Sequence, residues 1–530
     1  MPSSIDRVFE RRLSGLVNSG EPQILQGGRK GVEKESLRVT PAGALARTPH
    51  PASLGSALTN EHITTDFSEA LIELVTPAFT HSWELLQYLL DLHQFVYRHL
   101  KDELLWATSM PCAIDRDEDI PLAQYGSSNV GRMKTVYRSG LGLRYGRMMQ
   151  AISGVHFNYS FPSQFWEAYA TLRESRDRGQ QFISASYFDL LRNYRRCGWI
   201  VLYLFGVSPV VCKSFLRGRE PNLPALNAGT VYEPYATSLR MSDIGYRNRN
   251  QAGLSVSVNS LDEYVRDLTR AITTPHAPYE ALGVKVKGPN GDEWRQLNAN
   301  ILQIENEYYS FIRPKRVARS GERPTKALQR AGVEYVEVRA LDVSAFDPVG
   351  VNQNKLRFLE AFLALCVLKD SPLISASDEA RLDQNHLTVA RRGREPGLTL
   401  SREGRDVPMR EWAHELLDSM TGICEVLDRG DPLRPYANAL AVQAAKLDNV
   451  ALTPSARLMN ELTSTGESFF DQALRMSSLH KDYFLEMYAP NEERIGELGA
   501  AAADSIERQR ALETGRQESF DSYLDRYFAK

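Results

Sequence analysis

Two glutamates, Glu33 and Glu35, stand one residue apart in the stretch Gly31–Val39 and are the first residues of the chain whose spacing suggests chemistry. Because side chains alternate along an extended strand, both carboxylates would point to the same face. Two like charges side by side repel each other and lose hydration, which is unfavourable unless a cation or an arginine lies between them. A pair of acids is also typical of a strand whose polar face is wet. The pair alone leaves a cation site and a solvated strand edge both open.

Three later segments with strand-like alternation repeat this arrangement and favour the cation site. Their polar residues are Glu73 within 71–75, His156 and Asn158 within 153–162, and Glu337 with Arg339 within 333–342. A carboxylate among apolar neighbours, such as Glu73, is costly to bury alone, so we expect it to have a metal or arginine partner. Many carboxylates with few histidines suit a hard cation, Mg²⁺ or Mn²⁺, better than a structural zinc.

Such a cation site points to a nucleotide, because protein-bound Mg²⁺ commonly takes phosphate oxygens as further ligands. The chain has no G-x-x-x-x-G-K-[ST] loop and no set of protein-kinase motifs. Basic residues would therefore have to hold the phosphates with the metals, and the candidates are Arg313, Lys315, Arg316 and Arg339. The basic cluster at 313–316 fits a solvated loop equally well. These residues together predict a metal-dependent enzyme that transfers a phosphoryl group.

The composition excludes several other classes of protein. The 530 residues carry a formal net charge of -3, so there is no global basic field for nucleic-acid binding. The most apolar run, Trp199–Phe205, is too short to span a bilayer, and the N-terminal segment has no apolar secretory core. The five cysteines are scattered without a C-x-x-C pair, which predicts five small core residues rather than disulfides or a zinc site. We therefore expect a cytoplasmic protein that contacts neither membranes nor nucleic acids.

The periodicity of the chain predicts an α+β fold in which helices surround an antiparallel sheet. We expect a sheet-centred body over residues 1–350 and a mainly helical region over 351–530, packed together as one integrated domain. Residues 121–150 are rich in glycine and tyrosine and are expected to form a long loop over the site. The segment 303–309 alternates like a further strand. Helices are expected over 5–17, 83–105, 185–206, 355–369, 407–428, 436–447, 454–487 and 491–514.

Several long motifs also resemble those of one enzyme family. They are Gly31–Val39, Ile63–Glu73, Ile152–Asn158, Tyr235–Tyr246, Leu302–Tyr309, Ile312–Arg316 and Glu334–Asp342. In this order they resemble the proteobacterial type of glutamate–cysteine ligase, with a collinear match from about residue 27 to residue 400. The resemblance implies the curved, funnel-like antiparallel sheet of the glutamine synthetase superfamily. It also implies that L-glutamate, L-cysteine and ATP react through a γ-glutamyl phosphate to give γ-glutamylcysteine, ADP and phosphate, the first step of glutathione synthesis.

The resemblance assigns roles to individual residues as well. The implied metal ligands are Glu33, Glu35, Asp66, Glu73, His156 and Glu337, which would hold Mg²⁺ or Mn²⁺. Arg339 would face the transferred phosphoryl group, and Arg240 would stabilise the same anionic region or hold the substrate carboxylate. The implied substrate contacts are Tyr137, Gln150, Asn158, Tyr246 and Tyr309. Arg313, Lys315 and Arg316 remain the candidates for the nucleotide side, and we expect a monomer.

Two alternatives stay open at this point. A related carboxylate–amine ligase that joins glutamate to another amine would use the same metals and phosphate contacts and differ only in the tyrosine pocket. A nucleotide- or metal-binding regulator without activity would lack acids at the metal positions, and none is missing from this sequence.

Overall fold

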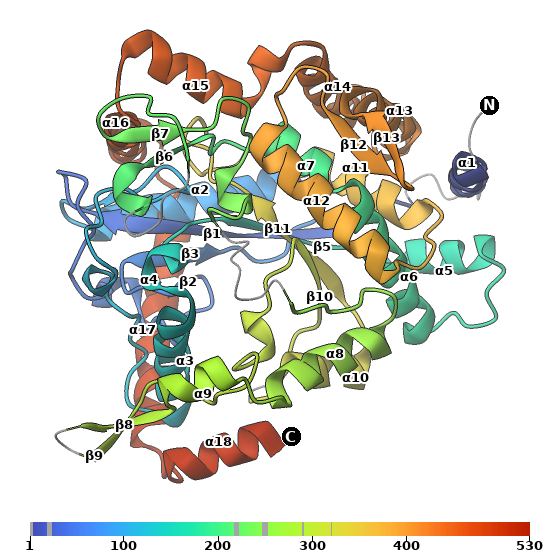
Figure 1. Cartoon of the computed structure of the whole chain (residues 1–530). Helices are drawn as coiled ribbons and strands as arrows, with labels where there is room; N and C mark the ends of the chain where they lie inside the picture. The colour runs from blue at the N-terminus through green and yellow to red at the C-terminus, as the bar shows by residue number, and fades with distance from the viewer. Residues whose placement is uncertain are drawn as a thin grey trace.

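The computed structural model describes residues 4–18, 24–216, 222–245, 253–288, 291–319 and 321–529. A seven-stranded antiparallel sheet crosses the middle of the molecule, with helices on both sides (Figure 1). Its order is β10-β11-β5-β1-β3-β2, and β4 pairs with β1 outside this path. The strands are β1 (Arg29–Val39), β2 (Ile63–Thr65), β3 (Leu71–Val75), β4 (Leu104–Leu105), β5 (Val155–Ser160), β10 (Ile312–Lys315) and β11 (Tyr335–Leu341). The predicted α+β class is confirmed.

The remaining strands form three small two-stranded sheets, and the helices make up most of the rest. The strands are β6 (Val210–Cys212), β7 (Thr230–Tyr232), β8 (Lys285–Gly288), β9 (Gly291–Trp294), β12 (Thr399–Arg402) and β13 (Arg405–Pro408). The α-helices are α1 (Ser4–Asn18), α2 (Ser82–His99), α3 (Asn129–Tyr145), α4 (Arg147–Gln150), α5 (Ser163–Leu172), α6 (Gln180–Cys197), α7 (Trp199–Phe205), α8 (Leu261–Thr273), α9 (Ala277–Leu282), α10 (Pro324–Ala331), α11 (Gln353–Leu368), α12 (Ala376–Arg392), α13 (Met409–Leu427), α14 (Pro435–Asp448), α15 (Pro454–Thr465), α16 (Phe469–Asp482), α17 (Glu492–Thr514) and α18 (Phe520–Ala529).

The apolar face of the sheet is made by the residues that alternate with the acids. Val32 on β1 is paired with Phe157 on β5, which is paired in turn with Val338 on β11. All three belong to the main hydrophobic core, together with apolar residues of α2, α6, α7 and α11. The strand register thus fixes which side chains are turned away from the core, because a shift by one residue would exchange the two faces.

A buried ion pair ties the sheet to the helical layer. Lys30 of β1 lies 2.8 Å from Glu360 of α11, and the two side chains are only 2% exposed. Tyr159 and Tyr436 donate hydrogen bonds to the same carboxylate, at 3.3 and 2.6 Å. Because Glu360 has a cation and two hydrogen-bond donors as partners, the negative charge of its carboxylate is compensated inside the protein.

The prediction of a long loop over 121–150 is wrong for most of this segment, because 129–145 forms the helix α3 and 147–150 forms the short helix α4. Ser128 caps α3 by accepting a hydrogen bond from the amide of Gly131. Gly140, one of the glycines that suggested a loop, serves close packing within α3 instead. A Cβ on Gly140 would lie 2.2 Å from Gln303 Oε1, so a larger residue would displace that side chain.

Other expectations need smaller corrections. The segment 303–309 is not a strand, since Glu305–Glu307 forms a turn of 3-10 helix. The helix expected over 454–487 is divided at Gly466 into α15 and α16. The helices α12 and α18 and the hairpin β12–β13 were not predicted. Over the described part of the chain, no helix combines the length and hydrophobicity that a membrane crossing needs.

The cysteines are partly as expected. Cys197, Cys366 and Cys424 are free and buried, as predicted. Cys112 and Cys212 instead form a disulfide with an S–S distance of 2.07 Å, although they are 100 residues apart. The prediction of five unpaired cysteines is therefore wrong. Sequence spacing could not reveal this pair, because only the fold brings the segment after β4 next to β6.

Candidate active site

A cavity of about 480 Å³ lies over the polar face of the sheet, and we call it the acid cavity. Its floor is formed by side chains of β1, β3, β5 and β11, and its walls come from α3, the 304–309 segment and α18. The acidic residues and the histidine that line it are Glu33, Glu35, Asp66, Glu73, His156, Glu307, Glu322 and Glu337. All six residues expected as metal ligands are therefore brought to one cavity.

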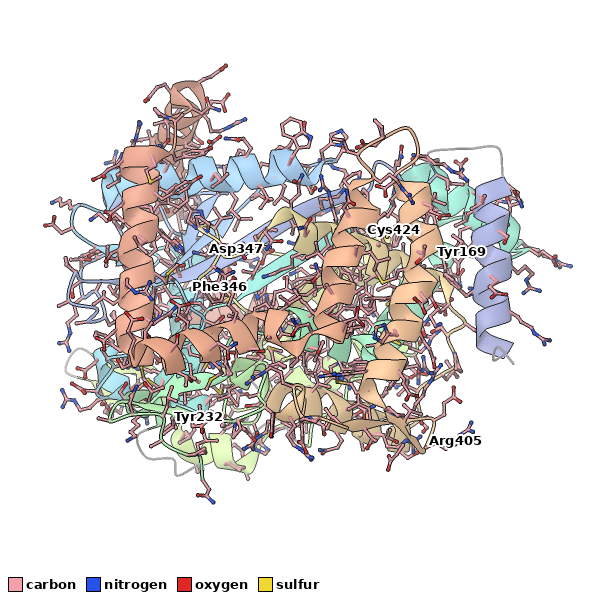
Figure 2. All side chains as sticks on the ribbon, turned by 90° about the horizontal axis from the view of Figure 1, so that it is seen from above. Tyr169, Tyr232, Phe346, Asp347, Arg405 and Cys424 are labelled. Atoms are coloured by element: carbon pink, nitrogen blue, oxygen red, sulfur yellow. A yellow bond between two sulfur atoms is a disulfide. The ribbon has the colours of Figure 1, made fainter. Side chains whose placement is uncertain are left out.

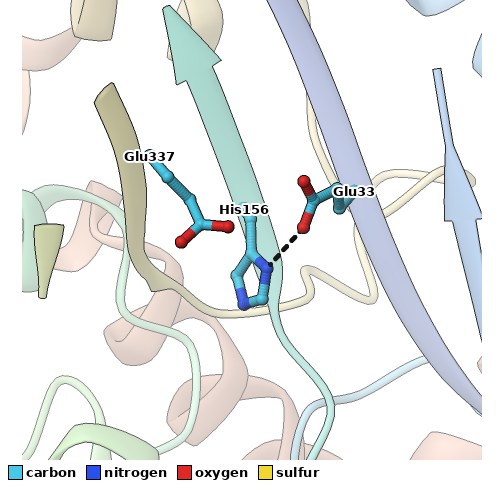
Figure 3. Close-up of side chains that lie close together, drawn as sticks. All are labelled: Glu33, His156 and Glu337. Carbon is cyan, nitrogen blue, oxygen red and sulfur yellow. Dashed lines mark hydrogen bonds and ion pairs between the residues drawn. The ribbon is translucent and has the colours of Figure 1, made fainter. Parts of the chain in front are cut away.

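The first group of potential ligands spans three neighbouring strands. Glu33, His156 and Glu337 each place one donor atom within 4.8 Å of the other two. The carboxylate of Glu33 accepts a hydrogen bond from His156 Nδ1 at 3.1 Å, and Glu337 lies on the other side of the ring (Figure 3). Asn158 donates to the second oxygen of Glu33 at 2.9 Å. The carboxylate of Glu33 is thus held in place from the same strand that carries the histidine.

A second group lies next to the first and shares the histidine. Glu35, Glu73 and His156 also offer donor atoms within 4.8 Å of one another. Glu35 and Glu73 are directly opposite each other in the β1–β3 register. The backbone amide of Gly154 donates to Glu35 at 2.6 Å. The loop after β2 adds Asp66 to this side of the cavity.

The electrostatics of the two groups differ. Burial and the neighbouring Asp66 raise the pKa of Glu35 to about 8. Burial, followed by repulsion from Glu33, raises the pKa of Glu73 well above its usual range. Burial also opposes ionisation of Glu33 and Glu337, but the hydrogen bond from His156 lowers the pKa of Glu33, and the positive charges of Lys315 and Arg339 lower that of Glu337.

These donors fit a hard divalent cation. Carboxylate oxygens, which dominate both groups, are ligands that suit Mg²⁺ and Mn²⁺, whereas structural zinc is usually held by several cysteines or histidines. Glu35 and Glu73 resist ionisation because negative charge is crowded around them, and a cation would remove that cost. The strand edge that the sequence left open is not solvated, since the side chains of Glu33 and Glu35 are only 19% and 5% exposed.

Basic residues face the acids from β10 and β11. Arg339 donates to Glu337 at 3.1 Å, and Lys315 donates to the other oxygen of the same carboxylate at 3.2 Å. Arg313 also lines the cavity, although its guanidinium donates to the carbonyls of Asn306 and Tyr308. Arg316, the fourth candidate for the phosphates, is not part of the cavity lining.

Arg316 instead donates to the carbonyls of Ala331 and Gly332 at the C-terminal end of α10. Cations commonly bind the free carbonyls at a helix C-terminus. The structure therefore separates this residue, which directly follows β10, from Arg313 and Lys315, because successive residues of an extended chain point to opposite faces.

Arg240 lies behind the cavity wall and is 1% exposed. Its guanidinium is 3.7 Å from the buried carboxylate of Asp342 and donates to the carbonyl of Arg339 at 3.3 Å. A Cβ on Gly154 would lie only 2.0 Å from Arg240 Nη2. The arginine thus supports the backbone that carries Arg339 and the amide that binds Glu35.

The expected amino-acid contacts are partly assembled. Tyr137, Gln150 and Tyr309 line the acid cavity, and Gln150 donates to the hydroxyl of Tyr309 at 2.7 Å. Burial, followed by the negative charge of Glu307, raises the pKa of Tyr137 well above its usual range. Asn158 does not line the cavity itself but donates a hydrogen bond to Glu33, which does. Tyr246 lies outside the described residues.

Comparison with known proteins places this chain in a family. The family model described as glutamate-cysteine ligase matches residues 13–389. A glutamate–cysteine ligase of Alcanivorax borkumensis is 50% identical over 98% of this chain and 99% of its own length. One from Pseudomonas putida strain W619 is 48% identical, over 98% of each chain. This chain belongs to the glutamate–cysteine ligase family.

The solved structure of a Francisella tularensis glutamate–cysteine ligase, in complex with AMP, shares the fold of this family member. It aligns with a TM-score of 0.88 and 37% identity over 95% of this chain and 98% of that one. A bifunctional glutathione synthetase from Pasteurella multocida aligns with a TM-score of 0.68 at 22% identity, and this likeness concerns the fold alone.

Apart from Tyr137, which the resemblance named, the sequence did not predict one wall of the acid cavity, the face of α3. Its lining residues are Val130, Met133, Lys134, Tyr137, Arg138 and Leu141. These positions follow the spacing of three and four residues of an amphipathic helix, so the signal was present under the glycine-rich composition. Arg138 donates to the carbonyl of Asp66, and this contact joins α3 to the acidic floor.

The C-terminal helix α18 supplies a second wall that was not predicted. Tyr523 and Tyr527 line the acid cavity, although they follow the last strand of the sheet, which ends at Leu341, by more than 180 residues. Phe520 and Leu524, on the same helix, pack with Met133 in a small apolar cluster. Nothing in the local sequence of α18 indicates its place, because only long-range packing brings it to the sheet.

Proposed function

We propose that this ligase catalyses the ATP-dependent attachment of L-cysteine to the γ-carboxylate of L-glutamate at the acid cavity, through a γ-glutamyl phosphate. The observation that carries the proposal is the pair of adjacent ligand groups that share His156, found in a chain of the glutamate–cysteine ligase family. The AMP bound in the Francisella ligase supports a nucleotide site in the same fold.

We assign the metal positions to the six residues expected from the sequence. Glu33, His156 and Glu337 would hold one Mg²⁺ or Mn²⁺, and Glu35 and Glu73 would hold a second with the other side of the imidazole. Asp66 completes the acidic wall beside them. When bound, the ions neutralise the repulsion between the substrate carboxylate and the triphosphate and stabilise charge on the phosphoryl oxygens.

Arg339 is proposed to bind the transferred phosphoryl group. Its fork of N–H donors matches phosphate oxygens, and it enters the cavity beside the first ligand group. Lys315 and Arg313 extend the positive charge along β10 and would contact the remaining phosphates. Arg240 is a positioning residue, since it acts through the backbone of Arg339 and Gly154.

The amino-acid substrates would occupy the side of the cavity next to α3. Tyr137, Tyr309 and Gln150 combine aromatic surface with polar tips, which suits a small polar amino acid. The hydrogen bond between Gln150 and Tyr309 fixes both side chains before substrate binds. The amine would attack the acyl phosphate from this wall. We also propose that the enzyme works as a monomer in the cytoplasm, which size-exclusion chromatography and cell fractionation would test.

The test follows ADP release by the purified chain with ATP, Mg²⁺ and glutamate, with each candidate amine added in turn. We expect the highest kcat/KM with L-cysteine and detection of γ-glutamylcysteine by mass spectrometry. A higher kcat/KM with an amine other than cysteine would identify the related carboxylate–amine ligase instead. No ADP release with any amine would contradict the enzymatic assignment.

A matched pair of variants locates the reaction. Glu33→Gln removes a donor from the first ligand group, whereas Glu334→Gln makes the same change on a carboxylate that is 44% exposed and outside the cavity lining. The proposal requires loss of turnover in the first variant and near-normal turnover in the second.

A further inference from the structure

A second cavity, of about 200 Å³, lies where the loop after β11 meets the C-terminal helices. It shares no lining residue with the acid cavity. Its walls include Phe346 and Asp347 of that loop, which lie among the C-terminal helices in Figure 2. The first turns of α11 and α15 and one face of α14 complete it. We call it the cation cavity, because its charged lining residues are Lys355, Lys446, Arg457 and the single acid Asp347.

The most buried of these cations lacks a polar partner. Lys355 is 3% exposed, and its ammonium group makes no hydrogen bond or ion pair with any residue that the structure describes. The contact it does make is with the ring of Phe205, whose centroid is 5.7 Å from Nζ. A buried ammonium group without a hydrogen-bonded partner costs several kcal/mol, of which an aromatic ring returns about 1–2.

The other two cations are also without an ion pair among the described residues. Lys446 donates to the carbonyl of Leu204 at 2.9 Å and to the side chain of Gln443 at 2.7 Å, which are both neutral. The guanidinium of Arg457 lies 3.9 Å above the ring of Phe346. Asp347 accepts two hydrogen bonds from Asn352, at 3.1 and 3.3 Å, and stays beyond ion-pair distance of the three cations.

Two helices add positive potential to the same space. The cavity is lined by Asn352 and Asn354 at the start of α11 and by Pro454 at the start of α15. Helix N-termini carry free amide groups and about half a positive charge, so they favour anions. Three side-chain cations and two helix starts therefore converge on one small volume.

Burial disfavours the charged form of both lysines, and for Lys446 a neighbouring cation adds to this effect. Burial, followed by the nearby charge of Lys355, lowers the pKa of Lys446 to about 7. Burial likewise lowers the pKa of Lys355. A negative ligand would favour the charged form of both lysines, because it would balance positive charge that the cavity itself does not balance.

We propose that the cation cavity is a binding site for a small oxyanion with two negative charges, of the phosphate class. Lys355, Lys446 and Arg457 would donate to its oxygens, and the start of α11 would face it. The cavity is well below the roughly 300–1,000 Å³ of sites for drug-sized ligands, so an intact nucleotide would not fit. This inference does not depend on the proposed ligase reaction, because the two cavities have separate linings.

Titration calorimetry with inorganic phosphate, on the full chain without nucleotide and with EDTA present, tests the site. We expect saturable binding by the unaltered chain and at least about 10-fold weaker binding in Lys355→Met and in Arg457→Gln, since each removes a charge-assisted hydrogen bond. Arg457 is on the exposed side of the cavity, so its variant should fold even if Lys355→Met does not. Lys287→Met, which removes a lysine side chain that is 93% exposed on β8, is the matched control and should bind phosphate normally.

The outcomes separate this site from the acid cavity, whose basic residues also attract phosphate. Equal binding by the unaltered chain, Lys355→Met and Arg457→Gln would place the phosphate elsewhere and overturn the proposal. Absence of saturable binding in the unaltered chain at millimolar phosphate would also overturn it. Sulfate should compete with phosphate, whereas chloride at the same ionic strength should not, because the proposal requires a doubly charged oxyanion.

Discussion

The acid cavity and the cation cavity are opposite in sign but alike in their physics. In the first, Glu35 and Glu73 face each other across two strands, and in the second, Lys355 and Lys446 lie against one phenylalanine ring. Each cavity gathers like charges that the fold does not pair. Burial shifts the pKa of these groups towards the neutral form in each case.

The pair Lys30–Glu360 shows the contrast inside the same molecule. Its two side chains are as buried as Glu35 and Lys355, but they contact each other at 2.8 Å, and two tyrosines donate hydrogen bonds to the carboxylate. A charge pair of this kind needs no ligand. Buried charged groups that have neighbours of the same sign and no opposite charge therefore indicate the places where a ligand of opposite charge would bind.

The largest expected effect is that of Glu33→Gln on turnover. The change removes one ligand of the first group while keeping the size of the side chain, and it leaves His156 without its carboxylate partner. We expect kcat to fall at least about 10³-fold, the upper end of the loss that follows removal of one electrostatic contact to the transition state. ADP release measures kcat, and circular dichroism checks that the fold is kept. Near-normal activity would remove Glu33 from the metal site.

Breaking the ion pair between Lys30 and Glu360 should lower the stability of the protein rather than its turnover. Lys30→Met leaves Glu360 buried without its cation, so we expect the free energy of unfolding to fall by about 3–5 kcal/mol. Urea denaturation monitored by fluorescence measures this value. The double variant Lys30→Met/Glu360→Leu should recover most of the loss. A Lys30→Met variant as stable as the parent would show that the comparison between paired and unpaired charges does not hold.

Arg339→Lys tests geometry at constant charge. Lysine keeps the positive charge next to Glu337 but loses the planar fork, so we expect kcat to fall about 10²–10³-fold with little change in stability. Rapid-quench measurement of ADP formation in a single turnover isolates the phosphoryl-transfer step. If that rate were unchanged, Arg339 would serve only to compensate Glu337.

Much of the acid cavity could be predicted from the sequence, because a period of two places alternate residues on one face. Glu33 and Glu35 on β1, Glu73 on β3 and Glu337 on β11 lie where alternation places them. The α3 wall was missed because its glycines, which fit close packing in the structure, resemble those of a loop. Local sequence patterns predict well which residues share a strand face, but they predict close packing between helices poorly.

The rest of the site depends on contacts between distant segments. Tyr527 reaches the acid cavity from the last helix, and Cys112 meets Cys212 across 100 residues. The cation cavity likewise combines α7, the loop after β11 and the starts of α11 and α15. No local period links such positions, so only the three-dimensional structure could reveal them.

Metal removal should make the stability of the protein sensitive to alkaline pH. The pKa of Glu35 is raised to about 8, and that of Glu73 is raised too, so the metal-free fold holds protons that the unfolded chain releases above its ordinary glutamate pKa. This contribution to stability is complete below about pH 4.5 and is lost as pH rises through about 8. Each tenfold difference in proton affinity between the folded and unfolded chains is worth about 1.4 kcal/mol. Glu33 and Glu337 have lowered pKa values and act only at acid pH.

We therefore expect Tm in EDTA to fall by several degrees between pH 6 and pH 9, and Mg²⁺ to prevent most of the fall. Differential scanning calorimetry with and without Mg²⁺ measures the effect. Glu35→Gln should flatten the EDTA curve, whereas Glu334→Gln should leave it unchanged. Parallel curves with and without Mg²⁺ would mean that the acids of the sheet do not bind the metal.

The smallest expected effect concerns the cation cavity and has the opposite sign to that of Lys30→Met. Lys355→Met replaces an unpaired buried ammonium group with an apolar side chain of similar length, so we expect the free energy of unfolding to rise by about 1–2 kcal/mol in phosphate-free buffer. Phosphate should then stabilise the parent chain but not the variant, since only the parent retains the proposed ligand contacts. Urea denaturation at zero and at high phosphate measures both changes. A loss of stability in Lys355→Met without phosphate would show that the charge of this lysine is compensated within the fold. The cation cavity would then not resemble the acid cavity in holding unpaired buried charges.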